Sequence, residues 1–162
     1  MANENWCMIG YHSVSVLADA VAKGLPLDKE EVLKAMVSSS TIPYLDGTGK
    51  YMEKGYVALD HNGSAASLTL EYAYDDWTIY HTALLAGNRS VADIYKKRAA
   101  NYTNVFDTNI GYARPRYADG RWKENFNLLS THGEGFIEGN ALNYSFYVPQ
   151  DVNNMILSLI HI

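Results

Sequence analysis

The stretch SLTLEYAYDDWTIYHTALLA, residues 67–86, decides the fold class of this chain. Apolar and aromatic side chains recur along it at the spacing of an α-helix, and they line most of its surface. Only one strip is consistently polar, and it consists of Glu71, Asp75, Thr78 and Thr82. A helix that is apolar on most sides is buried on most sides. The stretch therefore predicts a long helix in the interior of a helical protein.

A more amphipathic segment follows this buried helix, and the same pairing recurs along the chain. The predicted pairs are residues 8–23 with 28–38, residues 67–86 with 91–104, and residues 140–148 with the segment from Gln150 onward. The helix at 28–38 opens with Asp28 and Glu31, which have the spacing of a capping box. We expect an all-α chain of three inner–outer helical hairpins, which is about half of an (α/α)6 toroid.

Long irregular segments join these helices. Residues 38–63 hold a proline and several glycines, and a connection of that length without regular structure favours a functional loop. The tyrosines of this loop either flank a ligand or pin the loop to the core. Residues 106–134 are also irregular, and the sequence ADGR at 118–121 is typical of a hairpin turn. We expect a short β-hairpin between Tyr117 and Trp122.

The composition of the 162 residues is that of a globular protein, with 48% hydrophobic and 19% charged side chains. The formal net charge is −5 and no basic run occurs, which argues against nucleic acid as a partner. Cys7 is the single cysteine, so an internal disulfide is excluded, and its apolar neighbours favour a core filler over a nucleophile. No apolar stretch has the length of a membrane span. Thirteen tyrosines and three tryptophans suit either a core or sugar rings.

The stretch GFIEGNALNY, residues 135–144, sets one carboxylate, Glu138, among glycines and apolar side chains. Gly135 and Gly139 allow positive φ or a close approach of the backbone. The following residues are apolar and aromatic up to Pro149, so we expect a tight loop that delivers Glu138 to the mouth of a buried helix. A desolvated carboxyl there can hold a proton near neutrality, as a general acid requires. The alternative is an acid at a helix start, where the helix dipole favours it.

Three motifs in a fixed order resemble one enzyme family. They are MIGYHSVSVLADA at residues 8–20, LEYAYDDW at 70–77, and EGN at 138–140 followed by YVPQDV at 147–152. Together they resemble the calcium-dependent α-mannosidases of glycoside hydrolase family 92, over about residues 3–156 of this sequence. One short motif would not be specific, but three separate motifs in order are.

The resemblance implies an N-terminal β-sandwich packed on an (α/α)6 barrel. It also implies an exo-acting enzyme that removes terminal mannose from mannosides or N-glycan-type glycans with inversion and with a bound Ca²⁺. The general acid of the family lies in the Glu-Gly-Asn motif, which here is Glu138-Gly139-Asn140. We further predict Asn140, Asn143 and Asp76 as substrate-binding residues and Asn140 as a candidate calcium ligand. Asp75 and Asp76 point to different faces of a helix, so one of them supports the barrel instead.

An inverting enzyme also needs a second carboxylate, about 6.5–9.5 Å from the first, as the general base. In the family this base lies in an acidic motif far downstream of the matching segment, so we expect this chain alone to be inactive. Leu142 stands where many members carry tryptophan, which leaves the linkage preference open.

Other interpretations remain open at this point. The chain can be a non-catalytic carbohydrate-binding helical domain that uses its aromatic loops, or a truncated product without a function of its own. We expect residues 1–156 to be a partial barrel whose partners are the remainder of the barrel, the β-sandwich and a mannose-containing glycan. Family members are commonly exported, so we expect a periplasmic, cell-surface or secreted protein.

The last six residues, LSLIHI at 157–162, resemble the translated end of a transposon adapter used in sequencing libraries. We expect them to be a non-native tail. The alternative is that they complete the last helix, which their apolar character allows.

Overall fold

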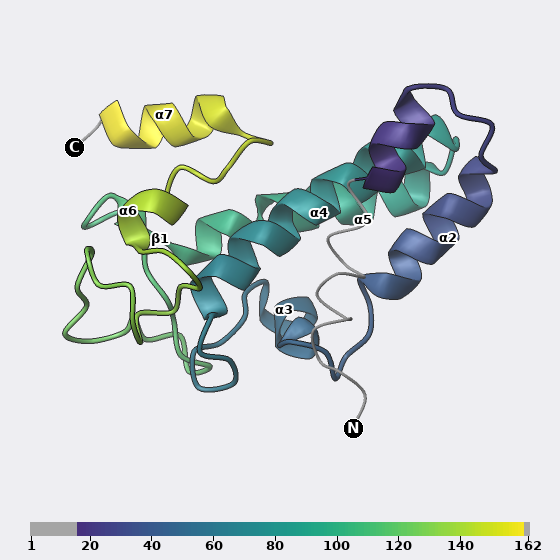
Figure 1. The fold of residues 1–162 in the computed structure, drawn as a ribbon. Coiled ribbons are helices and arrows are strands. Elements are labelled where there is room, and N and C mark those ends of the chain that lie inside the picture. Colours follow the sequence, from purple (N-terminus) through teal and green to yellow (C-terminus); the bar gives the residue numbers. More distant parts are fainter. Residues whose placement is uncertain (1–15, 161–162) are drawn as a thin grey trace.

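The computed structural model describes residues 16–160, with side chains described for residues 16–157. Helices dominate, as predicted, and they form three successive hairpins (Figure 1). The hairpins are residues 16–22 with α2 (Lys29–Ser39), α4 (Ala65–Leu85) with α5 (Arg89–Arg98), and α6 (Ala141–Tyr144) with α7 (Val152–Ile160). The all-α fold class is confirmed, and the arrangement fits about half of an (α/α)6 toroid.

The long helix α4 is the central element of the described chain (Figure 1). Fourteen of its 21 residues are buried, whereas α5 buries only Ala92 and Tyr95. The predicted difference in burial between the two helices is therefore confirmed. α4 packs against α2, α5 and the 3₁₀ helix η1 (Ala99–Val105) that directly follows α5.

The polar strip of α4 is buried together with its apolar faces. Asp75, Thr78 and Thr82 are all buried. The Thr78 hydroxyl donates to the Asp75 carbonyl at 2.8 Å, and the Thr82 hydroxyl donates to the Thr78 carbonyl at 3.0 Å. A hydroxyl that bonds back to its own helix needs no water, so these threonines can lie in the interior.

A short helix, α3 (Thr48–Lys54), lies in the connection that the sequence pattern left irregular. Gly47 and Gly55 flank it in left-handed conformations, with φ of 78° and 76°. Glycine adopts this conformation without a steric penalty and commonly ends helices, so the glycines that indicated a loop are the boundaries of the helix. Tyr51 and Tyr56 are buried, so they pin this connection to the core, whereas Tyr44 is exposed.

The two strands of the described chain lie before the predicted hairpin in the sequence. β1 (Phe106–Asp107) pairs with β2 (Tyr112–Ala113) in antiparallel register, at a place the sequence pattern did not indicate. The predicted hairpin between Tyr117 and Trp122 forms as a short turn, since the Tyr117 N–H donates to the Arg121 carbonyl at 2.9 Å. Among the described residues one antiparallel bridge, between Arg116 and Trp122, flanks this turn.

The helix predicted at 140–148 is wrong in length, because α6 ends at Tyr144. Ser145 follows it with its hydroxyl oxygen accepting from the Ala113 N–H at 2.7 Å, which ties the helix end to β2. Pro149 disfavours helical geometry at Val148, so the chain runs in non-helical conformation to α7. The buried helix expected behind Glu138 is therefore a single turn.

Two predictions fall at the ends of the described region. Residues 16–22 are helical, whereas residues 8–15 of the same predicted helix, and Cys7, lie outside the described residues. At the other end α7 continues to Ile160. No helix among the described residues combines the length and apolar character needed to cross a membrane.

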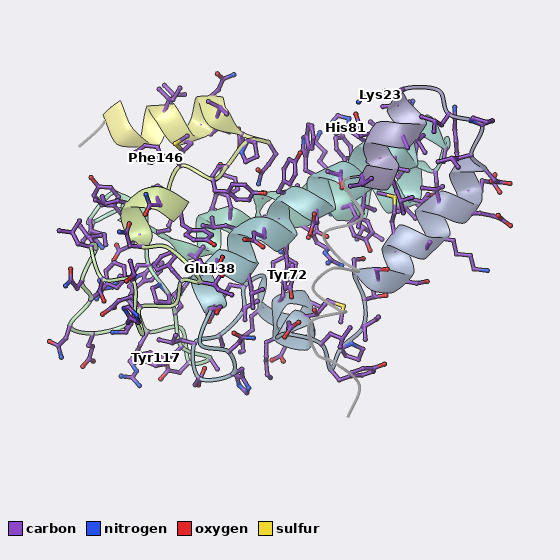
Figure 2. The ribbon with its side chains drawn as sticks, viewed as in Figure 1. Lys23, Tyr72, His81, Tyr117, Glu138 and Phe146 are labelled. Atoms are coloured by element: carbon purple, nitrogen blue, oxygen red, sulfur yellow. The ribbon has the colours of Figure 1, made fainter. Side chains whose placement is uncertain are left out.

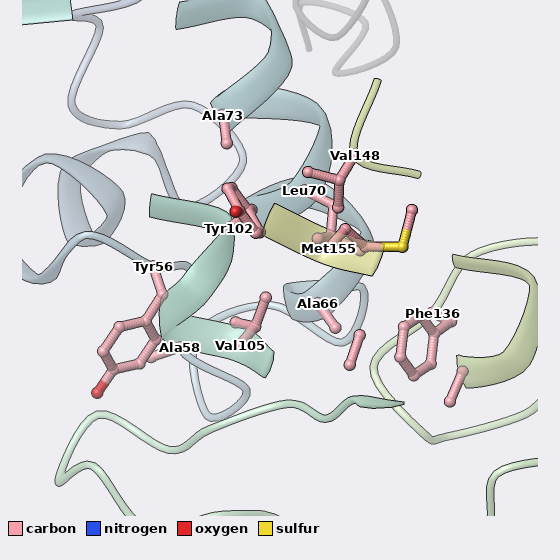
Figure 3. Packing of buried hydrophobic residues seen from close by; sticks show 12 residues of the cluster. Tyr56, Ala58, Ala66, Leu70, Ala73, Tyr102, Val105, Phe136, Val148 and Met155 are labelled. Atoms are coloured by element: carbon pink, nitrogen blue, oxygen red, sulfur yellow. The ribbon is translucent and has the colours of Figure 1, made fainter. Parts of the chain in front are cut away.

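The core beside α6 joins segments that are far apart in the sequence (Figure 3). Leu70 and Ala73 of α4 meet Tyr102 and Val105 of η1 there. The same cluster takes in Phe136, Ala141, Val148 and Met155 from the C-terminal part of the chain. This packing holds the segment that contains Glu138 against the beginning of α4.

Candidate active site

The loop of residues 135–140 is bound to the first turn of α4. The Gly135 carbonyl accepts hydrogen bonds from the Ala66 and Ser67 N–H groups at 2.9 and 3.3 Å. These N–H groups belong to the set that has no partner within a helix, and Ser64 at the N-cap makes no side-chain bond to them. The loop therefore caps α4, and α4 in turn fixes the position of the loop.

The two glycines of the loop meet different requirements. Gly135 has φ of +84°, and a Cβ there would lie 2.7 Å from the Pro115 Cβ. A Cβ at Gly139 would lie 2.9 Å from the Tyr144 ring. Both positions exclude a side chain, so the glycines allow the loop to pack closely on its neighbours.

Ile137 is anchored through both of its backbone polar groups. Its N–H donates to the Ser67 hydroxyl oxygen at 3.0 Å, and its carbonyl accepts from the Tyr144 hydroxyl at 2.8 Å. The Tyr144 ring also packs on Phe136, with ring centroids 5.5 Å apart. The residue directly before Glu138 is thus held by the first turn of α4 and by the last residue of α6.

Glu138 follows with φ of 53°, in the left-handed region. Among the described residues, only Asp46 and Asn125 are other non-glycine residues with positive φ. Asp and Asn adopt this conformation more readily than other side-chained residues do, so Glu138 is the unusual case. Its side chain is exposed, and it lies at the end of α4 that begins at Ala65 (Figure 2). The expectation of a desolvated carboxyl is therefore not met in this chain, because a single-turn helix and an open loop leave it in water.

Asn140 and Asn143 follow Glu138 in the sequence. Asn140 is the N-cap of α6, since its Oδ1 accepts from the Asn143 N–H at 3.1 Å. Its Nδ2 donates to the Leu129 carbonyl at 3.4 Å. The Asn143 side chain is exposed. The structure thus joins Asn140 to Asn143 at the start of α6, directly after the loop of Glu138.

Asp76 is not part of this group. It lies nine residues beyond Ser67, which is about 14 Å along the helix axis. Its side chain is 0% exposed. Oδ2 accepts from the Tyr51 hydroxyl at 2.6 Å and from Arg98 Nε at 3.0 Å, and Oδ1 lies 2.9 Å from Arg98 Nη2. We therefore assign Asp76 to the framework of the fold, the role that sequence analysis expected for one of the two adjacent aspartates.

A complete calcium site does not form from the described residues. Among them no group of three or more His, Cys, Asp or Glu side chains is placed to hold a metal ion. The predicted ligand Asn140 already uses its Oδ1 as a helix cap. Calcium takes six to eight oxygen ligands, so the residues present do not fit the ion by themselves.

The environment of Tyr144 is negatively charged. Burial raises the pKa of its hydroxyl, Ser67 opposes that rise, and the charges of Glu71 and Glu138 add to it. Burial together with Glu71 also raises the pKa of Tyr147 to about 12. Sequence reasoning missed Ser67 and Tyr144, which bind Ile137, and Glu71, whose charge acts on Tyr144 together with that of Glu138. Glu71 stood out only as a polar residue on a buried helix, and no local pattern pointed to the other two.

The model of the family described as "Glycosyl hydrolase family 92 catalytic domain" matches residues 1–159 of the chain. The chain belongs to glycoside hydrolase family 92. Among solved structures it is similar to a family GH92 α-mannosidase from Bacteroides thetaiotaomicron, with 36% identity and a TM-score of 0.86 over 91% of this chain. The same mannosidase in complex with mannoimidazole gives 35% identity, a TM-score of 0.86 and the same coverage.

An inverting mannosidase of family GH92 from Bacteroides thetaiotaomicron VPI-5482 is also similar, with 31% identity and a TM-score of 0.81 over 92% of this chain. The match covers 20% of the first mannosidase, in either structure, and 22% of the inverting mannosidase. The chain therefore spans about a fifth of the length of these relatives. Comparison with curated proteins finds no match.

Proposed function

We propose that this chain supplies the general acid of a family 92 exo-α-mannosidase, and that Glu138 is that acid. The observation that carries the proposal is the backbone of Glu138, which is held at φ of 53° within the motif where the family places its acid. Left-handed conformations of side-chained residues concentrate at functional sites, because a structure keeps such strain only where its surroundings enforce it. The mannosidases among the solved relatives support the substrate class.

In the proposed reaction Glu138 begins protonated. It donates its proton to the glycosidic oxygen while the bond from that oxygen to the anomeric carbon breaks, so the leaving sugar departs as an alcohol. Glu138 is exposed in this chain. The exclusion of water around the acid therefore has to come from bound substrate and from the rest of the barrel.

Inversion is part of the proposal, and one solved relative is an inverting mannosidase. It requires a carboxylate that activates water on the opposite face of the sugar, about 6.5–9.5 Å from the acid. We assign this role to no residue of the present chain. We propose Asn140 and Asn143 for contact with the terminal mannose, because Asn140 belongs to the same motif as Glu138, binds the Asn143 N–H, and the Asn143 side chain is exposed.

Calcium dependence and an exported location complete the proposal. The ligands of the ion would come largely from residues outside this chain, and no step of the reaction is assigned to it. Chelation of calcium in the full-length enzyme is expected to abolish hydrolysis, and added Ca²⁺ is expected to restore it. Activity that persists after exhaustive chelation contradicts this part of the proposal.

The test of the acid is Glu138→Gln in the full-length enzyme, which keeps the shape of the side chain and removes its proton. General acid catalysis contributes about 10²–10⁴-fold, so a loss of that order is expected with an alkyl mannoside. An activated aryl mannoside should lose much less, because its leaving group departs without protonation. Equal losses on both substrates, together with a lower melting temperature, would show that Glu138 has a structural role only.

A further inference from the structure

We propose that Ser67 and Tyr144 are positioning residues for Glu138, and that together they fix the backbone that carries its carboxyl. This inference rests on the function proposed above for Glu138. The two side chains come from different helices, α4 and α6, and both bind Ile137. Neither residue belongs to the Glu-Gly-Asn motif.

The first step is the double anchorage of Ile137. The N–H and the carbonyl of a residue belong to the two peptide units that flank it. If only one of these groups is bonded, the peptide unit on the other side can still rotate. Here the N–H donates to Ser67 at 3.0 Å and the carbonyl accepts from Tyr144 at 2.8 Å, so the peptide units on either side of Ile137 are fixed. The peptide unit that links Ile137 to Glu138 is one of them.

The second step is the anchorage after Glu138. Gly139 lies against the Tyr144 ring, where even a Cβ would come within 2.9 Å, and Asn140 is held as the cap of α6. Glu138 is the residue between these two anchored segments. It has to bridge them in whatever backbone conformation closes the gap, and that conformation is φ of 53°. The anchorage of the residues on both sides of Glu138 therefore explains why this glutamate adopts a backbone conformation that is more typical of glycine.

The third step concerns the placement of Ser67. It lies in the first turn of α4, its side chain is 0% exposed, and its own N–H binds the Gly135 carbonyl. It thus contacts the loop at two points and transfers the rigidity of the long buried helix to the loop. A carboxyl displaced by about 1 Å from its productive position can lose roughly 100-fold in rate, so such support has catalytic value.

The test uses Tyr144→Phe in the full-length enzyme, since this change removes the hydroxyl and keeps the ring against Phe136 and Gly139. We expect kcat on an alkyl mannoside to fall roughly 10- to 100-fold with little change in KM. An activated aryl mannoside, which needs no proton from Glu138, should be hydrolysed at nearly the original rate. Ser67→Ala, which removes the acceptor of the Ile137 N–H, should give the same pattern and decides the question if the first variant fails to fold.

The matched control is Tyr56→Phe. The Tyr56 hydroxyl also donates to a backbone carbonyl, that of Tyr117 at 3.0 Å, and Tyr56 belongs to the same core cluster as Phe136. Among the described residues, its hydroxyl has no hydrogen bond to the loop of residues 135–140. Removal of the Tyr56 hydroxyl should therefore lower stability alone, and any change in rate should be the same for the alkyl and the aryl mannoside.

Combination with Glu138→Gln separates the possible outcomes. If Tyr144 acts through Glu138, the double variant is no slower than Glu138→Gln alone. A further loss in the double variant, or equal losses of Tyr144→Phe on both substrates, overturns the positioning role while leaving Glu138 as the acid. If Glu138→Gln itself shows no dependence on the leaving group, the proposed function fails instead.

Discussion

The buried pair of Asp76 and Arg98 offers the sharpest test of what holds this fold together. Asp76 is 0% exposed and is bound by Arg98 at both oxygens and by the Tyr51 hydroxyl. The guanidinium also donates to the Ser40 carbonyl at 3.3 Å and lies over the rings of Tyr51 and Tyr95. The Asp76–Arg98 pair thus joins α3, α4, α5 and the end of α2. Asp76→Asn removes its charge with almost no change of shape.

The expected loss is worked from these contacts. The asparagine Oδ1 can replace one carboxylate oxygen, but its NH₂ group then takes the place of the other oxygen, where Arg98 needs an acceptor at 2.9 Å. Breaking a buried ion pair from one side costs about 3–5 kcal/mol, because the remaining charge stays desolvated. The Arg98 side chain is 16% exposed and keeps its bond to Ser40, so we expect the lower end, about 3 kcal/mol.

The assay is urea unfolding of the full-length enzyme, followed through the transition of the catalytic domain. Glu53→Gln is the matched control, because it makes the same acid-to-amide change in a pair with Lys50 that is short, 2.6 Å, but exposed. Exposed pairs contribute little, so this variant should unfold like the original protein. The double variant Asp76→Asn with Arg98→Met should be more stable than Asp76→Asn alone, because it also removes the unpaired charge. The reasoning is refuted if Asp76→Asn unfolds like the Glu53→Gln control.

Further predictions concern the strain at Glu138, alkaline pH and the apolar surface. Glu138→Gly should be more stable than Glu138→Ala by roughly 1 kcal/mol, because glycine adopts a left-handed φ without strain; equal stabilities in urea would contradict that conformation. Burial raises the pKa of Tyr147 to about 12, above its unfolded value, so its contribution to stability is complete below about pH 10 and is lost as the pH rises towards 12. Tyr147→Phe should flatten this alkaline loss, and an unchanged pH profile of the unfolding free energy would speak against it. The 162-residue chain expressed alone should self-associate, since Phe146, Ile94 and Leu157 are 57%, 56% and 54% exposed. A single monomeric species in sedimentation velocity would exclude this.

The sequence by itself determined those features whose causes are local. Asp28 was predicted as the N-cap of the helix at 28–38, and its Oδ1 accepts from the Glu30 and Glu31 N–H groups. The capping side chain lies within three residues of the groups it binds, so the pattern is readable in one dimension. The burial of α4 was equally readable, because a helix with apolar residues on most sides has no other stable environment.

The sequence also located the loop of Glu138 but not its surroundings. The glycines around Glu138 indicated a tight turn, and Gly135 does adopt positive φ. The predicted helix behind it was too long. The Ser145 hydroxyl at its end accepts from the Ala113 N–H, 32 positions away, and no local pattern records such a contact.

Only the tertiary structure decided which polar groups meet. Asp76 and Arg98 are 22 residues apart and pair because α4 packs against α5. Ile137 and Ser67 are 70 residues apart and meet because the loop caps the first turn of α4. A residue's spacing along the chain fixes the face of a helix on which it lies, but the partner on that face is set by how helices pack, and this depends on the whole core at once. Glu138 could therefore be proposed as the acid from the sequence, whereas the framework role of Asp76 required the fold.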